Sequence, residues 1–192
     1  MQLMKDICNF LFEIGMLKRT PRTGLQFLGS GKESVAEHCF RVIIIGYTLA
    51  KLNAQVDENK ILKMTLLHDI LESRTGDLNY VNKKYLKVDE EKAVNELAAT
   101  LPFGEELKAL LREFHEKKTE EALIANDADQ LELIIMLKEY GDLGNKYTKD
   151  WIAFALKRLC TPQARELAET ILSTDSAEWW FKDKSDWWVW GK

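Results

Sequence analysis

Residues 34–52 read SVAEHCFRVIIIGYTLAKL, a capped apolar stretch that is typical of a helix. Ser34 is a residue type that often caps the start of a helix, and Glu37 follows three residues later, which completes a capping box. An apolar run from Val42 to Leu52 comes next. The stretch therefore predicts a helix that begins after Ser34 and carries His38 on its first turn.

Helical patterns extend over most of the remaining sequence. Ten glycines and three prolines leave long stretches uninterrupted, and no alternating pattern of useful length indicates a strand. We expect helices at about 3–17, 87–100, 104–117 and 120–141, with a loop at about 18–33. A further helix should begin at Asp57 and run to His68-Asp69, with a break at 75–77. Two more should follow the caps Thr148 and Thr161-Pro162. The sequence predicts an all-α fold, a compact single-domain helical bundle over residues 1–175.

Composition excludes several classes of function. The chain has 192 residues, of which 46% are hydrophobic and 30% charged, and its net charge is −4. This balance argues against bulk electrostatic binding to nucleic acid or to an anionic membrane, and no apolar run reaches membrane-spanning length. The three cysteines form no C-x-x-C pair, which favours a reducing compartment. We expect a cytoplasmic protein that binds neither nucleic acid nor membrane.

The last residues differ from the rest of the chain. Five of the six tryptophans fall within residues 176–192. Because so much aromatic surface is seldom left in water, we expect this tail to dock on the body of the protein or in a subunit interface.

Two histidines and two aspartates stand out as candidate metal ligands: His38, the pair His68-Asp69, and Asp129. They come from three separate segments, so only a tertiary fold can bring them together. A mixed set of two nitrogens and two carboxylates suits Mn, Co, Fe, Ni or Zn better than Ca. Spacing alone leaves open whether they bind a metal or are ordinary packed and surface side chains.

Four stretches resemble the HD-domain metal-dependent phosphohydrolases, above all the bacterial 5′-deoxynucleotidases and the HD-domain-containing protein 2 family. They are ESVAEH (33–38), LHDILE (67–72), TGD (75–77) and DADQLE (127–132), and LKRTPRTG (17–24) is also similar. The resemblance covers about residues 10–145. It implies an all-helical HD-domain fold, a homodimer and hydrolysis of nucleoside 5′-monophosphates. It also implies one divalent metal per subunit (Mn, Co, Fe, Ni, Zn or Mg) on His38, His68, Asp69 and Asp129.

The same resemblance assigns roles to four further residues. Glu72, one turn beyond Asp69, matches the acid/base carboxylate, and the alternative is an exposed glutamate at a helix end. Asp77 matches a substrate-contacting carboxylate, although Gly-Asp is also ordinary turn chemistry. Arg19 matches a nucleotide-contacting arginine, or is a solvated loop residue. Thr20 stands where the deoxynucleotidases carry tryptophan beside the sugar, which puts selectivity for deoxyribose in question. Arg22 and Lys32 are further candidates for charge near the phosphate.

Two other functions stay open at this point. One is an HD phosphohydrolase with another nucleotide substrate, a nucleoside triphosphate or an alarmone. The other is a non-catalytic nucleotide or metal sensor whose Trp-rich tail binds a partner. The combination of four ligands with Glu72 favours an enzyme, because a sensor needs no proton-transfer carboxylate. Base preference, native metal and pathway do not follow from the sequence.

Overall fold

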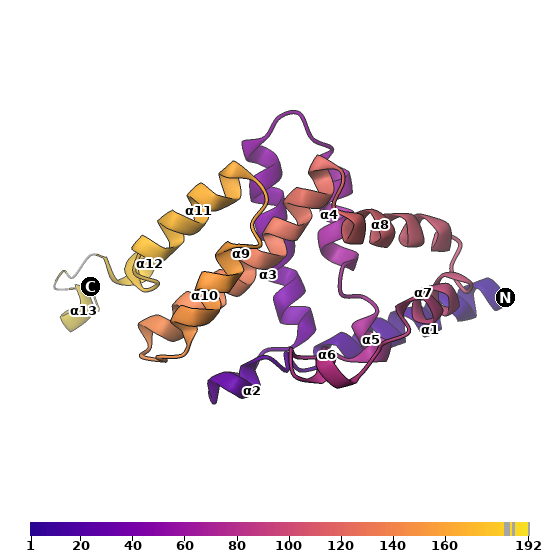
Figure 1. The fold of residues 1–192 in the computed structure, drawn as a ribbon, viewed down its shortest axis with the longest axis horizontal. Coiled ribbons are helices and arrows are strands. Elements are labelled where there is room, and N and C mark those ends of the chain that lie inside the picture. Colours follow the sequence, from indigo (N-terminus) through magenta and orange to yellow (C-terminus); the bar gives the residue numbers. More distant parts are fainter. Residues whose placement is uncertain (183–184, 186, 192) are drawn as a thin grey trace.

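The computed structural model describes residues 1–182, 185 and 187–191, and within them it is all-helical (Figure 1). The only extended pairing in this part is an isolated bridge between Pro21 and Ser34. The expected all-α fold is confirmed. No helix of the described chain combines the length and the apolar character that crossing a membrane requires.

The long helix α9 (Glu120–Asp142) is the centre of the bundle. It packs against α3 (Val35–Leu52), α4 (Glu58–Leu67), α8 (Gly104–Glu116), α10 (Thr148–Leu156) and α11 (Pro162–Ser173), which surround it in Figure 1. Apolar residues lie on several sides of α9, as is typical of a helix enclosed by others. Its buried members include Ile124, Ala128, Leu131 and Ile134, which join the largest core cluster.

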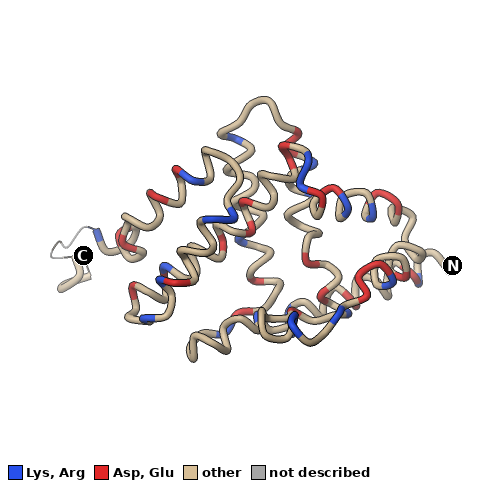
Figure 2. The backbone as a smooth tube through the Cα atoms, in the orientation of Figure 1, with Lys and Arg blue, Asp and Glu red and all other residues tan. Residues whose placement is uncertain are grey.

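A second, smaller core lies toward the N-terminal end of the molecule. It joins α1 (Gln2–Ile14), α7 (Glu90–Ala98) and α8 around Ile70, Leu71 and Leu97. Short helical turns connect these parts: η1 (Gly15–Lys18), α2 (Leu25–Leu28), α5 (Glu72–Thr75) and α6 (Asn82–Tyr85). The two termini lie at opposite ends of Figure 1. Lys and Arg are interspersed with Asp and Glu along the helices (Figure 2).

Three of the expected helix caps are confirmed. Ser34 and Glu37 form the complete capping box of α3, and the side chains of Asp57 and Thr161 accept a backbone N–H at the starts of α4 and α11. The expectation for Thr148 was wrong, because this residue is the first of α10 and its hydroxyl donates to the Asn145 carbonyl instead. The helix is preceded by a turn in which the Asn145 side-chain oxygen accepts a hydrogen bond from the Tyr147 backbone N–H.

Two helices end earlier than their patterns predict. α1 stops at Ile14, and residues 15–18 continue as a 3₁₀ turn. α4 stops at Leu67 rather than at Asp69, since Ile70 and Glu72 donate to the carbonyls three residues before them, Leu67 and Asp69. Tighter turns of this kind are common where an α-helix ends. The chain thus leaves the helix at the His-Asp pair.

Gly46 shows how closely α3 approaches α4. A side chain at this position would place a Cβ 2.7 Å from the Thr65 methyl group, so only glycine allows the two helices this separation. Thr65 lies one turn before His68, and Gly46 lies two turns after His38. The contact therefore sets the distance between the two helices that carry the histidines.

The Trp-rich tail contains α12 (Glu178–Phe181) and α13 (Trp187–Trp190), and residues 183, 184, 186 and 192 of it lie outside the described residues. Its rings contact one another, with Trp180 and Phe181 both packed on Trp188. The indoles are nonetheless largely exposed in the single chain, from 43% for Trp188 to 87% for Trp179.

Candidate metal centre and its cavity

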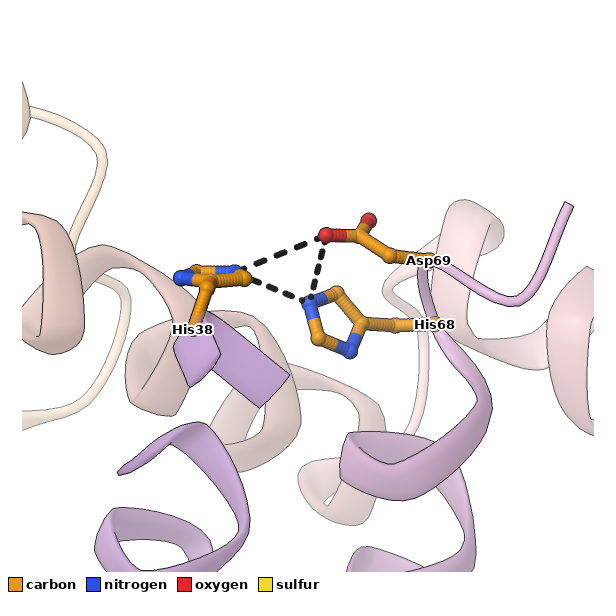
Figure 3. A group of neighbouring side chains, drawn as sticks. All are labelled: His38, His68 and Asp69. Atoms are coloured by element: carbon orange, nitrogen blue, oxygen red, sulfur yellow. Dashed lines mark hydrogen bonds and ion pairs between the residues drawn. The ribbon is translucent and has the colours of Figure 1, made fainter. Parts of the chain in front are cut away.

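Side chains from segments distant in sequence meet at one point, and Figure 3 shows three of them: His38, His68 and Asp69. His38 comes from the first turn of α3, and His68 and Asp69 come from the turn after α4. The two Nε2 atoms lie 3.3 Å apart, and Asp69 Oδ2 lies 3.5 Å from that of His38 and 3.3 Å from that of His68. From α9, Asp129 brings its Oδ1 to 3.3 Å from His38 Nε2. The four residues singled out in the sequence therefore share one site.

The spacing of these atoms fits a metal ion. Metal–ligand bonds of 2.0–2.2 Å place neighbouring ligand atoms about 2.8–3.1 Å apart at octahedral angles and about 3.3–3.6 Å apart at tetrahedral angles. The separations in the site, 3.3–3.5 Å, match that range. Two imidazole nitrogens that face each other beside two carboxylates form a donor set for a first-row divalent cation.

Each histidine is held by its other ring nitrogen. His38 Nδ1 lies 2.5 Å from Glu132 Oε2, and His68 Nδ1 lies 2.9 Å from the Thr65 carbonyl oxygen. An Nδ1–H that donates to such an acceptor leaves Nε2 free to bind a metal, as is usual for metal-bound histidines. Glu132 is fully buried, and Arg41 Nε lies 3.4 Å from its Oε1. Both imidazoles are thus oriented toward the centre of the site.

Glu132 and Arg41 are supporting residues that the sequence did not single out. A signal was present, because each lies three residues after a candidate ligand on the same helix: Glu132 after Asp129, and Arg41 after His38. Residues at this spacing lie on one helix face.

Charge around His38 alters its titration. Burial alone would lower its pKa, but hydrogen bonds to Asp129 and Glu132 raise the pKa of His38 to about 10. Burial would raise the pKa of Asp129, yet its contact with His38 lowers that pKa overall. The acidic neighbours favour a protonated imidazole when no metal is bound, so metal affinity is expected to increase with pH.

Glu72, the first residue of α5, lines a cavity of about 270 Å³ together with Asp69, Asp77 and Asp129. Its Oε2 is buried and has no hydrogen-bond partner in the described part of the chain. Burial and the neighbouring carboxylates of Asp69 and Asp77 raise the pKa of Glu72 to about 8. Raised carboxyl pKa values of this kind are typical of proton-transfer groups.

Asp77 has a structural contact as well as a place in the cavity. Its Oδ2 accepts a hydrogen bond of 2.7 Å from the Thr23 backbone N–H, and the Thr23 hydroxyl donates to its carbonyl oxygen at 2.8 Å. Gly76 before it adopts a positive φ of 70°. The turn therefore anchors the loop of residues 18–33 to the wall of the cavity.

Arg22, rather than Arg19, reaches this cavity. Its Nη1 lies 3.8 Å from Asp69 Oδ2, and its Nε lies 3.9 Å from Glu33 Oε2. The loop is held against the start of α3 by hydrogen bonds from Arg22 N to the Glu33 carbonyl and from Val35 N to the Thr20 carbonyl. This pairing, which no local sequence signal predicts, directs Arg22 inward.

Arg19 and Thr20 line a separate cavity of about 540 Å³ on the loop side. Arg19 is exposed, and the Thr20 hydroxyl donates to the Met16 carbonyl at 3.1 Å. The loop cavity shares Arg22 and Leu25 with the metal-site cavity. The structure thus places these two candidates next to the site and does not bring them into it.

Comparison with known proteins gives a consistent result. Residues 14–171 match the model of the HD domain family. A protein of Mus musculus named 5′-deoxynucleotidase HDDC2 is 31% identical over 146 residues, 73% of this chain and 72% of its own. The Dictyostelium discoideum protein of that name is 34% identical and covers 71% of this chain and 78% of its own. A conserved hypothetical protein from Pyrococcus furiosus superposes with a TM-score of 0.72 at 32% identity, over 85% of this chain and 98% of its own. The chain therefore belongs to the HD domain family.

Proposed function

We propose that the protein is a divalent-metal-dependent phosphohydrolase that releases phosphate from nucleoside 5′-monophosphates, chiefly deoxyribonucleotides. The main support for this proposal is the convergence of His38, His68 and Asp69 at 3.3–3.5 Å. Beside them lies a Glu72 oxygen that has no partner among the residues that the structure describes. The relatives named 5′-deoxynucleotidase support the substrate class. The cavity of about 270 Å³ beside these residues is the space in which a substrate would lie.

In this proposal His38, His68, Asp69 and Asp129 hold one divalent ion per subunit: Mn, Co, Fe, Ni, Zn or Mg. Such an ion, when bound, neutralises phosphate charge and lowers the pKa of water. Glu132 and the Thr65 carbonyl keep the two imidazoles in the tautomer that binds.

The remaining residues act on the substrate. Glu72 transfers the proton, either from the attacking water or to the leaving 5′-oxygen. Arg22 faces the phosphate, because its guanidinium is already next to Asp69 and can form paired hydrogen bonds to phosphate oxygens. Asp77 contacts the sugar from the cavity wall. Arg19 and Thr20 act from the loop cavity, with a smaller influence on which sugar is accepted.

A phosphate-release screen tests the proposal. Purified protein is assayed on deoxynucleoside and nucleoside 5′-monophosphates and on triphosphates, with Mn²⁺, Co²⁺, Mg²⁺ or EDTA. We expect release from monophosphates that EDTA abolishes, and none from the Asp69→Ala variant. Triphosphates as the preferred substrates would replace the proposal with the broader nucleotide phosphohydrolase. Nucleotide binding without any release would favour a sensor.

We further propose that the unit of residues 1–175 functions as a homodimer in the cytoplasm. Phe40, Ile44 and Tyr47 form a stripe along α3 with exposures of 69%, 50% and 43%, beside an apolar groove of about 560 Å³. Exposed apolar surface of this kind often marks an interface, and the exposed indoles of Trp179, Trp187 and Trp190 in the tail support a second one. Light scattering should give a dimer, and Phe40→Glu should shift it to a monomer.

The proposed location in the cytoplasm is supported by three free cysteines, which favour a reducing compartment.

A further inference from the structure

A second cavity, of about 550 Å³, is rich in aromatic side chains that the proposed chemistry does not use. Four rings line it: Phe27, Tyr80, Trp151 and Phe154. Trp151 is the centre of the group, with its ring centroid 6.4 Å from that of Tyr80 at 85° and 6.3 Å from that of Phe27 at 56°. The rings therefore form an open arrangement of edges and faces.

This aromatic cavity continues the metal-site cavity. The two share Tyr80, Leu133, Trp151 and Arg158 as a common wall. The metal-site cavity is lined by these shared residues and by the carboxyl groups of Asp69, Glu72 and Asp129. A ligand that extends from one cavity into the other would therefore meet acidic and metal-binding groups first and aromatic rings next.

A hydrogen-bonded chain fixes the wall between the cavities. Arg158 donates from Nη1 to the Tyr80 hydroxyl at 2.9 Å and from Nε to the Gln130 side-chain oxygen. Gln130 in turn donates to Asp129 Oδ2 at 2.7 Å. The position of the Tyr80 ring is thus tied, through two side chains, to a candidate metal ligand. Arg158 and Asp150 also give the aromatic cavity polar groups at its edge.

Three of the rings are poorly buried by the protein itself. Exposures are 62% for Phe154, 58% for Tyr80 and 45% for Phe27. A core role does not account for such exposure, whereas a flat ligand that is sandwiched on them would. Base–aromatic stacking is sequence-tolerant, because every nucleobase has a π-face.

We propose that the aromatic cavity is the nucleobase subsite, and that Trp151, Tyr80, Phe27 and Phe154 hold the base while the 5′-phosphate lies at the metal centre. The inference rests on the proposed function and adds the orientation of the nucleotide. The alternative direction, through the loop cavity of Arg19 and Thr20, offers no aromatic ring among its lining residues. Stacking predicts that the enzyme accepts several bases rather than one.

The test compares a nucleotide with its base-free counterpart. Phe154→Ala is the main variant, because Phe154 is exposed and its truncation should leave the fold intact. Trp151→Phe is the conservative partner, since Trp151 also packs against the buried cluster of Leu25 and Leu28. Phe12→Ala on α1, exposed by 75% and outside every cavity described above, is the matched control.

We expect Phe154→Ala to lower kcat/KM for deoxynucleoside 5′-monophosphates by about 5- to 150-fold, the usual range for loss of one stacking contact. The effect should fall mainly on KM. Hydrolysis of 2-deoxyribose 5-phosphate, which has no base, should change less than twofold. Trp151→Phe should retain most of the nucleotide activity, and Phe12→Ala should match the wild type on both substrates.

Equal losses on both substrates, or no loss on either, would overturn the subsite. A changed oligomeric state in Phe154→Ala with unchanged kinetics would also overturn it and assign the rings to an interface. Titration of dAMP and 2-deoxyribose 5-phosphate into Mn²⁺-loaded protein in a Glu72→Gln background makes the same comparison by binding. A protein that binds dAMP through these rings but never releases phosphate would contradict the proposed function and still confirm the nucleobase subsite.

Discussion

Asp127 and Asp129 lie two residues apart on α9, yet their surroundings are opposite. Asp127 is fully buried, and its carboxylate accepts three hydrogen bonds of 2.7 Å, from the Cys160 and Thr161 backbone N–H groups and from the Thr161 hydroxyl. Asp129 opens onto the metal-site cavity and lies 3.3 Å from His38 Nε2. Residues two apart on a helix point about 200° from each other, so they face different regions.

The contrast separates a structural carboxylate from a functional one. Three of the four donors to Asp127 belong to the segment before α11, and the fourth is the Asn126 side chain on α9, so its charge is used mainly to attach α11 to α9. Around Asp129 the carboxyl groups of Asp69, Glu72 and Asp77 gather on one cavity, and one Glu72 oxygen has no partner among the described residues. A fully satisfied charge stabilises the fold. An excess of unsatisfied charge instead favours a bound cation.

Removing a ligand should cause the largest change on the functional side. We expect His68→Ala or Asp129→Ala to lose the bound metal and about 10³-fold or more of the turnover, because a metal supplies several kcal/mol of transition-state stabilisation. Elemental analysis and phosphate release measure the two losses. Full metal occupancy in either variant would remove that residue from the ligand set.

Glu72→Gln should lose turnover by about 10²–10⁴-fold, the usual contribution of general acid–base catalysis, and should keep the metal. Glutamine preserves the shape of the side chain and removes its ability to exchange a proton. Parallel measurement of kcat and metal content is decisive, and a near-normal kcat would exclude the proton-transfer role.

On the structural side, Asp127→Ala should lower the free energy of unfolding by about 2–4 kcal/mol, because it leaves buried N–H groups without an acceptor. In a chain of this size that corresponds to a melting temperature about 5–15 °C lower. The matched control is Asp89→Ala, which removes an N-cap at the surface and should cost about 1 kcal/mol. If Asp127→Ala lost the bound metal while its melting temperature stayed unchanged, the assignment of Asp127 to the fold and Asp129 to the metal site would be wrong.

Stability of the metal-free protein should depend on the protonation of Glu72. Its pKa is about 8 in the fold against 4.5 for an ordinary glutamate, so the folded state binds the extra proton between these two pH values. Stability contributed by that proton is complete below pH 4.5 and is lost as pH rises toward 8. At pH 8 Glu72→Gln should therefore melt well above the wild type, by on the order of 10 °C. Scanning calorimetry at pH 5 and pH 8 in EDTA tests this, and an equal difference at both pH values would contradict it.

The smallest change concerns the sugar. Thr20 lines the loop cavity beyond Arg22, so Thr20→Trp should raise the ratio of kcat/KM for dAMP over AMP by about tenfold or less. A wild-type enzyme that already rejects AMP completely would show that another residue distinguishes the two sugars.

Much of the fold was predictable because it depends on local physics. The periodicity of apolar residues and the caps Ser34, Asp57 and Thr161 specify where helices begin, since each cap satisfies N–H groups of its own first turn. Helix ends were less predictable. Where α4 stops depends on how its last turn packs, which the local pattern does not encode.

The sequence by itself determined the helical class, the candidate ligands His38, His68, Asp69 and Asp129, and the carboxylate Glu72. These follow from residue type, helical spacing and resemblance. Only the tertiary structure decided that Arg22 rather than Arg19 faces the cavity, that Glu132 orients His38, and that aromatic rings from α2, α10 and residue 80 adjoin the metal site. The physical reason is that each of these depends on contacts between segments distant in the chain, whose geometry is set by helix packing and not by any local pattern of residues.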